Sequence, residues 1–297
     1  MVQSPNIPQA ARQPSSSRGL ATRLLPTLLA WFRRAYVFLV ARPTLQPLNL
    51  LVLRMALQAR GYDNCCTPDV TGEAYFLERI AATRPRLCLD VGANRGDYST
   101  ELLRRTDATV LAFDPLPTAF EHLSALEREY DGRMFAFNIA LGDANCELPL
   151  SYGEGAARLA SLLPQARHIG YVAASNVHTM TVPVRRLDDV FLAHPQRFAN
   201  GEIDLLKIDT EGYEYAVLLG ARLVIERLRP RFIQVECNWH QLFGGTSLWQ
   251  LYGLLPGYRC YQLLPYRRGW HRVEPGSPEA NVFRYSNFVF VRDDVRA

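Results

Sequence analysis

A single lysine and the acids around it form the part of this sequence with the clearest chemical character. Lys207 is the only lysine among 33 basic residues, and it lies in the run Asp204–Glu214 at the end of an apolar segment. A lysine ammonium is a compact point charge, and burial can lower its pKa so that it acts as a base. We expect Lys207 to be catalytic, either by removing a proton or by holding an oxygen as an ammonium. A simple salt bridge to Asp209, Glu211 or Glu214 is an open alternative.

Further acids and a histidine extend the candidate site. Asp209 and Glu211 stand where a strand is expected to end, so Asp209 is a candidate for both catalysis and cofactor binding. Glu211 and Glu214 are expected to support the substrate or the start of a helix, where an acid complements the helix dipole. Glu236 and His240 follow the next expected strand as a second pair of candidate bases. Asp209, Glu211 and Glu236 suit a divalent metal, but no ligand spacing demands one, and we expect a site without metal.

A glycine-containing turn earlier in the sequence predicts a nucleotide-like ligand. In Leu89–Asp97 an apolar strand runs into a turn before a helix starts. Glycines let the backbone approach a ligand, and the free N–H groups of a helix start favour a carboxylate or a phosphate. The three-glycine dinucleotide fingerprint is only partly met, which disfavours a nicotinamide-dependent oxidoreductase. The expected cofactor-binding residues of this turn are Asp90, Gly92, Asn94 and Gly96.

Two later acids follow expected strands at the same edge of the sheet. Asp114 comes 22 residues after Gly92 and is placed to accept both hydroxyl groups of an adenosine ribose. We favour this role over a helix cap before Pro115. Asp143 is a candidate for the adenine amino group, although an aspartate after Gly142 is also ordinary in a turn. The turn and these acids therefore predict a site for an adenosine-containing ligand.

The elements that position these residues alternate between strands and helices. Apolar strands are expected at 87–91, 108–113, 134–140, 203–209 and 232–237. Helices are expected at 71–82, 97–104, 116–128, 213–219 and 248–255. Strands that are apolar on both faces and separated by helices predict an α/β fold, with a mostly parallel sheet and helices on both faces. Residues 258–264 and 287–291 are expected as closing strands, with an antiparallel edge strand.

The chain is expected to contain a tail, an extension and one large domain. Residues 1–20 are rich in Ser, Pro, Gln and Arg and predict a disordered basic tail. Residues 21–70 predict a basic amphipathic extension, and 71–297 the large domain. Within it, about 144–201 lacks long helices and predicts an insertion with hairpin-like strands. Such an insertion is expected to form a lid or a substrate wall.

Charge and hydropathy distinguish the N-terminal extension from the rest. Residues 1–62 contain eight arginines and no acidic residue, although the net charge of the whole chain is only +4. Arginines and prolines interrupt the apolar stretches, so no transmembrane helix is expected. The pattern of 21–60 fits peripheral contact with anionic lipid, a helix packed on the domain, or an oligomer contact. Its large apolar residues include Leu24, Leu25, Leu28, Leu29, Trp31, Phe32, Tyr36 and Phe38.

Cysteine usage and arginine placement bear on location and partners. The six cysteines show no C-x-x-C spacing, so we expect reduced thiols and a cytoplasmic protein, with peripheral contact at the inner membrane surface as an alternative. No nucleic acid partner is expected, because the N-terminal arginines alternate with Leu, Trp and Phe and no aromatic RNA-binding motif is present.

Taken in order, these motifs resemble the FkbM family of S-adenosylmethionine-dependent methyltransferases. The resemblance covers about residues 86–265 and rests on Asp90–Gly96, Phe113–Pro115, Ala140–Asp143, Leu187–Asp189, Lys207–Glu214 and Val235–Glu236. The family often has Glu at the position of Asp114 and Val at the position of Thr210. Both departures are mild, although the shorter acid must lie closer to the ribose.

The resemblance implies a Rossmann-like class I methyltransferase fold with S-adenosyl-L-methionine at the carboxyl ends of the strands and S-adenosyl-L-homocysteine as product. It implies O-methyl transfer to a hydroxyl of a sugar, a glycan or a natural product, as in carbohydrate or polysaccharide biosynthesis. In such a site the turn Gly92–Gly96 faces the cofactor carboxylate, Asp114 the ribose and Asp143 the adenine. The alternative is a module in a glycan-assembly complex that binds an adenosyl cofactor or nucleotide without turnover.

Overall fold

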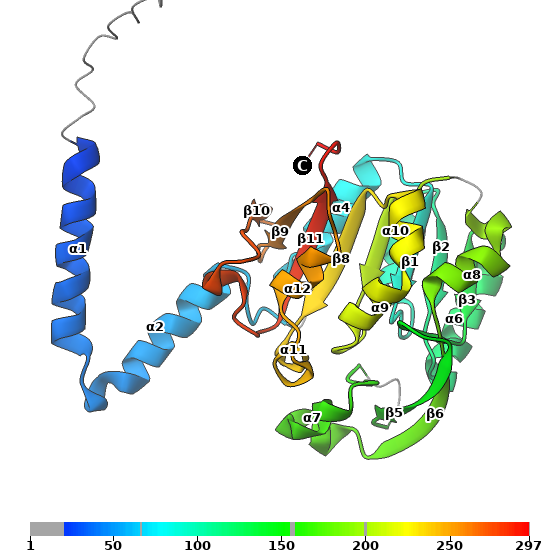
Figure 1. Cartoon of the computed structure of the whole chain (residues 1–297), viewed down its shortest axis with the longest axis horizontal. Helices are drawn as coiled ribbons and strands as arrows, with labels where there is room; N and C mark the ends of the chain where they lie inside the picture. The colour runs from blue at the N-terminus through cyan, green and yellow to red at the C-terminus, as the bar shows by residue number, and fades with distance from the viewer. Residues whose placement is uncertain (1–20, 66, 155–157, 199–200, 297) are drawn as a thin grey trace, which may run out of the picture. The chain divides into compact units, whose positions relative to one another are not determined.

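The structure, a computed structural model, contains two compact units (Figure 1). It describes residues 21–65, 67–154, 158–198 and 201–296, so the expected disordered tail at 1–20 lies outside the described residues. The boundary between the units falls between Ala56 and Leu57. It precedes the expected boundary at residue 70, because Tyr62 is buried in the core of the larger unit and its hydroxyl donates to the carbonyl of Glu279.

The smaller unit contains α1 (Ala21–Val40), η2 (Pro43–Leu45) and most of α2 (Gln46–Ala59). The chain turns after α1 because Arg42 is extended before Pro43, as a residue before proline usually is. The stretches Pro26–Val40 and Pro43–Ala59 are bent by 102°. No single helix of the described chain is long and apolar enough to cross a membrane. The bent pair taken together has the length and the composition of a membrane span.

The larger unit is built around an eight-stranded sheet with the order β10-β9-β11-β8-β7-β1-β2-β3. The strands are β1 (Leu87–Val91), β2 (Thr109–Phe113), β3 (Met134–Phe137), β7 (Leu205–Ile208), β8 (Phe232–Cys237), β9 (Tyr258–Leu263), β10 (Trp270–Arg272) and β11 (Ser286–Arg292). Strands β1, β2, β3, β7 and β8 are parallel, and edge strand β10 pairs antiparallel with β9. The predicted parallel sheet with an antiparallel edge is therefore confirmed.

Strand β11 differs from the expected closing strand in one respect. It pairs antiparallel with both β8 and β9, so it lies inside the sheet. The reason is visible in its side chains, since six consecutive residues from Ser286 to Val291 are buried. A strand whose side chains are buried on both faces needs packing against both faces of the sheet. The position between β8 and β9 gives β11 this packing.

Helices cover both faces of this sheet. One face packs against α4 (Glu73–Ala82), α5 (Asp97–Arg105) and α6 (Pro117–Glu129), and the other against α8 (Leu187–Ala193), α9 (Glu214–Gly220), α10 (Arg222–Leu228) and α12 (Leu248–Gly253). Figure 1 shows α9 and α10 in front of the sheet. The shorter helices are α3 (Pro68–Thr71), α7 (Gly170–Ser175), α11 (Trp239–Gly244), η3 (Pro164–His168), η4 (Pro195–Phe198) and η5 (Pro278–Ala280).

A second, three-stranded sheet lies in the region of the expected insertion, with the order β4-β6-β5. It consists of β4 (Ala140–Leu141), β5 (Cys146–Tyr152) and β6 (His178–Arg185). The expected strand 134–140 is thus divided, because β3 ends at Phe137 and the side chain of Asn138 donates to the carbonyl of Asp114. Four residues of the inserted region, Leu150, Arg158, Ala160 and Leu162, line the pocket described below.

Candidate active site

The site begins at the turn after β1, where the backbone conformation requires glycine. Gly92 has a φ of 78°, and a Cβ at this position would lie 1.8 Å from the carbonyl oxygen of Asp209 at the end of β7. Gly96 has a φ of 83° and packs against Leu126 as the N-cap of α5. Asn94 lies between them with a φ of 49°. The structure places Gly92 and Asn94 in the lining of the cavities, whereas Gly96 lies behind the turn.

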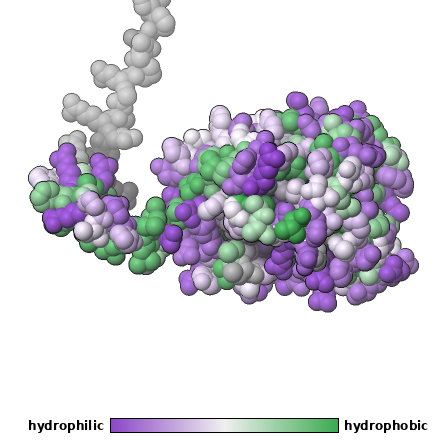
Figure 2. All heavy atoms as spheres, turned by 90° about the horizontal axis from the view of Figure 1, so that it is seen from below, coloured by the Kyte–Doolittle hydropathy of each residue, from purple (hydrophilic) through white to green (hydrophobic). Residues whose placement is uncertain are grey.

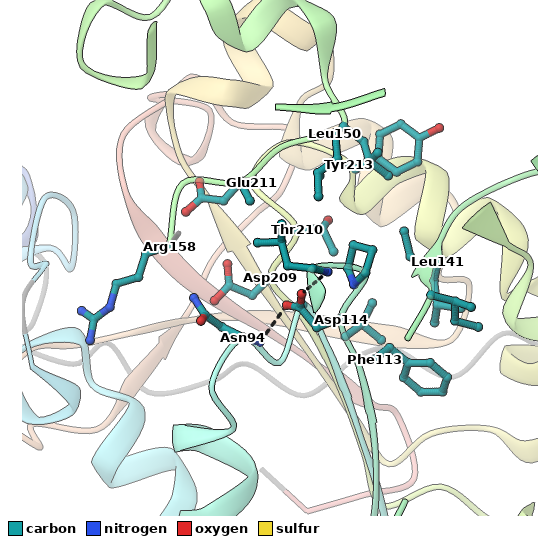
Figure 3. Close-up of a pocket in the computed structure, with 18 residues that line it drawn as sticks. Asn94, Phe113, Asp114, Leu141, Leu150, Arg158, Asp209, Thr210, Glu211 and Tyr213 are labelled. Atoms are coloured by element: carbon teal, nitrogen blue, oxygen red, sulfur yellow. Dashed lines mark hydrogen bonds between the residues drawn. The ribbon is translucent and has the colours of Figure 1, made fainter. Parts of the chain in front are cut away.

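Asp114 follows β2 directly, with its carboxylate turned toward this glycine turn (Figure 3). Its Oδ2 accepts from the backbone N–H of Asn94 at 2.9 Å, and its Oδ1 accepts from that of Leu116 at 2.9 Å. Burial raises the pKa of Asp114 to about 6 in spite of these two donors. Each oxygen keeps a lone pair for a further hydrogen bond. The N-cap of α6 is Leu116, so the helix-cap alternative for Asp114 is not what the structure shows.

A small pocket with mainly apolar walls opens beside Asp114 (Figure 3). Its apolar lining includes Phe113, Ile139, Leu141, Leu150 and Leu162. The expected adenine contact Asp143 is exposed after β4 and is absent from the lining of the cavities described here. It lies near the rim, where its charge helps burial to raise the pKa of Tyr213.

Lys207 lies at the end of β7 with its ammonium group enclosed. Its Nζ is 3.1 Å from Asp209 Oδ2, 3.6 Å from Asp90 Oδ1 and 5.0 Å from the centre of the Tyr98 ring. Burial lowers its pKa, but the carboxylates of Asp209, Asp90 and Glu73 outweigh burial and raise the pKa above its ordinary value. Lys207 is therefore an ammonium ion, and the lowered pKa considered from the sequence does not agree with these surroundings.

Asp90 lies beneath the turn, within β1. Its side chain is fully buried, where Oδ2 accepts from the hydroxyl of Ser99 at 2.7 Å and Oδ1 faces Lys207. Asp90 does not line either cavity in the described part of the chain. Its position is therefore that of a counter-charge that holds Lys207 and the start of α5.

Three carboxylates meet at the ends of β7 and β8. Oxygen atoms of Asp209, Glu211 and Glu236 all lie within 4.8 Å of one another. Burial, followed by the charge of Asp209, raises the pKa of both Glu211 and Glu236 well above the ordinary value. The side-chain amide of Asn238 donates to Glu211 at 2.8 Å and to Glu236 at 3.3 Å. Such a group can share protons, and its oxygen atoms could also hold a divalent cation.

The other two candidates of this region lie behind the carboxylates. His240 is fully buried, with Nδ1 2.6 Å from Asn238 Oδ1 and 3.2 Å from Glu211 Oε2. Burial lowers the pKa of His240 to about 4, so the ring is neutral, and it does not line the cavities. Glu214 accepts from the backbone N–H groups of Thr210 at 3.0 Å and Gly212 at 3.1 Å, so it holds the loop after β7 in place.

A larger cleft of about 710 Å³ opens from the same loop. Its acidic lining consists of Asp63, Glu73, Asp97, Glu101, Asp209, Glu211 and Glu236, against the basic residues Arg95, Arg158 and Lys207. Two aromatic side chains, Tyr171 of α7 and Trp239 of α11, also line it, with ring centres 6.0 Å apart. The rings meet edge to face and both are partly open to solvent, so apolar ring surface is available to a ligand.

Several residues of the cleft were not predicted from the sequence. Asn238 follows the same strand as Glu236, so its place at a strand end was a usable signal. Glu73 gives no such signal, because it lies in α4 before the first strand, yet it accepts from Gln234 and lines the cleft. Tyr98 and Tyr171 are likewise brought in by tertiary packing.

Comparison with known proteins gives one family. Residues 90–260 match the Methyltransferase FkbM domain. The AMB antimetabolite synthetase AmbE of Pseudomonas aeruginosa is 26% identical over 259 residues, which covers 68% of this chain and 12% of that protein. Methyltransferase sdnD of Sordaria araneosa is 30% identical over 156 residues, which covers 44% of this chain and 59% of that protein. The chain thus spans less than two thirds of either relative.

Solved structures with a similar arrangement include two O-methyltransferases. TomG of Streptomyces achromogenes, in complex with SAM, has a TM-score of 0.40 and 12% identity, with coverage of 77% of this chain and 82% of that chain. The O-methyltransferase of Bacillus cereus, in complex with SAH, has a TM-score of 0.39 and 14% identity, with coverage of 87% and 96%.

Proposed function

Because this chain belongs to the FkbM methyltransferase family, we propose that it transfers the methyl group of S-adenosylmethionine to a hydroxyl group of a sugar, a glycan or another natural product. The cofactor and methyl transfer follow from the family, and the hydroxyl acceptor is our proposal. One observation supports this proposal: the same residues line both the small pocket and the large cleft. A cofactor in the pocket and an acceptor in the cleft would meet at these residues. This set is Gly92, Asn94, Arg158, Asp209 and Glu211.

The residues of the small pocket fit S-adenosylmethionine. Gly92 leaves the backbone of the turn open where any side chain would meet Asp209. Asp114 has lone pairs for two ribose hydroxyls, and the apolar walls around Leu141 and Leu150 suit an adenine ring. When bound, the cofactor supplies a methyl group on a positively charged sulfur. The carboxylate of Asp209 at the junction favours such a positive charge.

We assign proton removal from the acceptor to Glu236. It lines the cleft, and its raised pKa makes its carboxylate a stronger base than an exposed one. His240 is unsuited because it is neutral, weakly basic and buried away from the cleft. Lys207 is also unsuited as a base, since its ammonium is held by Asp209 and Asp90. Lys207 is instead a positioning residue that fixes the carboxylate of Asp209 at the junction.

The lining of the large cleft supports a carbohydrate acceptor. The ring faces of Tyr171 and Trp239 offer apolar surface to the C–H groups of a sugar ring. The carboxylates of Glu211 and Glu236 offer acceptors to its hydroxyl groups. A ligand that is apolar on its faces and rich in hydroxyl donors at its edge matches this combination.

Calorimetric titration with S-adenosylhomocysteine, with NADH as control, tests the cofactor site first. Transfer of labelled methyl from S-adenosylmethionine to methyl glycosides of neutral hexoses and 6-deoxyhexoses then tests the acceptor. The proposal requires binding of S-adenosylhomocysteine alone and labelling of at least one glycoside oxygen. Labelling of none of these glycosides, with cofactor binding intact, would favour the binding module without turnover.

The variant Glu236→Gln and a chelator distinguish proton removal by Glu236 from metal binding by the three carboxylates. As proton acceptor, Glu236 contributes about 10²–10⁴-fold, so Glu236→Gln should lower turnover by this factor and leave S-adenosylhomocysteine binding intact. Turnover should continue in EDTA. Loss of turnover in EDTA that Mg²⁺ restores would assign Asp209, Glu211 and Glu236 to a metal instead.

A further inference from the structure

The smaller unit carries an apolar surface that its own described helices do not cover. None of the side chains described between 26 and 59 is buried, and most are exposed. In Figure 2, hydrophobic and hydrophilic residues lie side by side over these helices. The large hydrophobic residues among them are Leu28, Leu29, Trp31, Phe32, Val37, Phe38, Leu39, Leu48, Leu50, Leu51, Val52, Leu53 and Met55.

Helix α2 is the clearer case of the two. Between Leu48 and Leu57 its only polar residues are Asn49 and Arg54, so apolar side chains surround the helix. A helix that is apolar on all sides is normally covered by protein or by lipid. Helix α1 is different, because Arg33 and Arg34 interrupt its apolar residues and give it a basic face.

Charge indicates which kind of cover fits. The unit has no acidic residue, so Arg33, Arg34, Arg42 and Arg54 have no acidic partner within it. Four guanidinium groups without counter-charges attract phosphate groups, and Trp31 and Tyr36 are of the type that favours the boundary between lipid and water. This combination complements an anionic lipid surface better than an apolar protein groove.

The shape of the unit favours the bilayer surface over a crossing. Helix α2 has 14 residues and is about 21 Å long, against about 30 Å for the hydrocarbon core. The bend of 102° is fixed by two hydrogen bonds: the Tyr36 hydroxyl donates to Asn49 Oδ1 at 3.0 Å, and Asn49 Nδ2 donates to the Val40 carbonyl at 2.9 Å. We propose that α1 and α2 bind the surface of a bilayer that contains anionic lipid and so recruit the methyltransferase to it.

Sedimentation of the full chain with lipid vesicles tests this proposal, which does not depend on the acceptor. The protein should bind vesicles of phosphatidylcholine with phosphatidylglycerol and should bind pure phosphatidylcholine vesicles far less. Arg33→Glu with Arg34→Glu should weaken binding by about tenfold or more, because two attractive charges become repulsive. Arg222→Glu with Arg227→Glu, an equal charge change on exposed residues of α10, should leave binding unchanged.

A second variant tests the apolar contact. Leu51→Ser with Leu53→Ser should also reduce vesicle binding, and unchanged titration with S-adenosylhomocysteine shows that the variants are folded. Equal binding to both kinds of vesicle overturns the proposal. An oligomer that forms without lipid and is lost in the serine variant would also overturn the proposal, because the apolar surface would then bind a second copy of the chain. Vesicle binding that survives a wash with alkaline carbonate would also contradict the proposal, because the wash removes proteins at the bilayer surface and leaves only those that are inserted.

Discussion

At the scale of single residues, the site depends on one enclosed ammonium ion. Lys207 balances the fully buried carboxylate of Asp90, which has no other cation beside it in the described structure. We predict that Lys207→Met lowers the free energy of unfolding by about 3–5 kcal/mol, because it leaves that charge buried and unpaired. Urea unfolding measures the loss, and Lys207→Met with Asp90→Asn should recover most of it.

The same pair of variants separates support of the fold from catalysis. If Lys207 positions Asp209, turnover should stay low in the double variant while S-adenosylhomocysteine binding is retained. Recovery of turnover together with stability would show that Lys207 acts only on the fold. The distance of 3.1 Å between Lys207 Nζ and Asp209 Oδ2 is the contact that this experiment removes.

The pKa of Asp114, about 6, predicts a pH dependence of cofactor binding. A hydroxyl of the ribose donates to an ionised carboxylate more strongly than to a protonated one. Affinity for S-adenosylhomocysteine should therefore be constant above pH 6 and should fall by about tenfold per pH unit below it. Calorimetry between pH 5 and pH 7 measures the change. In Asp114→Asn the affinity should be weak and independent of pH, and a wild-type curve without a slope would contradict the ribose assignment.

At the scale of elements, the site depends on how closely β1 and β7 end together. Gly92→Ala should lower the free energy of unfolding by more than about 3 kcal/mol and abolish cofactor binding, because its Cβ would meet the Asp209 carbonyl. Gly132→Ala is the matched control, since Gly132 has a similar φ of 74° but no atom within 4 Å of the added Cβ. It should cost only about 1–2 kcal/mol, the strain of the left-handed conformation. Equal losses in both variants would show that the close approach has no effect.

The element that contributes Trp239 allows a separate test of the acceptor site. Trp239→Ala should raise the KM for a glycoside acceptor by about tenfold or more and leave S-adenosylhomocysteine binding unchanged, because the ring lines the cleft and not the small pocket. Leu242→Ala on the same helix removes an exposed side chain that does not line the cleft. Steady-state kinetics of the two variants should differ in KM, and equal values would exclude ring stacking.

The elements also show what sequence could and could not predict. Periodicity and glycine turns predicted the parallel strands, because both signals are local in the chain. They did not predict strand β10 or helices α10 and α11. These elements have only three to seven residues, and polar residues interrupt their apolar pattern. At the site, strand ends predicted Asp114, Asp209 and Glu236. Glu73 could not be found, since only packing of a helix against the sheet brings it to the cleft.

At the scale of the whole molecule, charge is divided between the ends of the chain. Residues 1–62 carry eight arginines without an acid, so the remaining residues carry a net charge of about −4. Acids outnumber bases around the large cleft as well. The proposed membrane-binding segment is therefore basic, whereas acids outnumber the three basic residues in the lining of the cleft. This division favours an acceptor sugar that presents its hydroxyl groups away from any phosphate.

The acidic cleft leads to a prediction about which acceptors are used. A phosphate ester of the best neutral glycoside should have a kcat/KM lower by about tenfold or more, because seven acids line the cleft against the three basic residues Arg95, Arg158 and Lys207. The ratio between the two acceptors should shrink as salt is added, since mobile ions screen the repulsion at the open side of the cleft. Paired kinetics at low and high ionic strength measure both effects. A preference for the ester would mean that Arg95 and Arg158, the two arginines of the cleft, dominate over its acids and bind the phosphate.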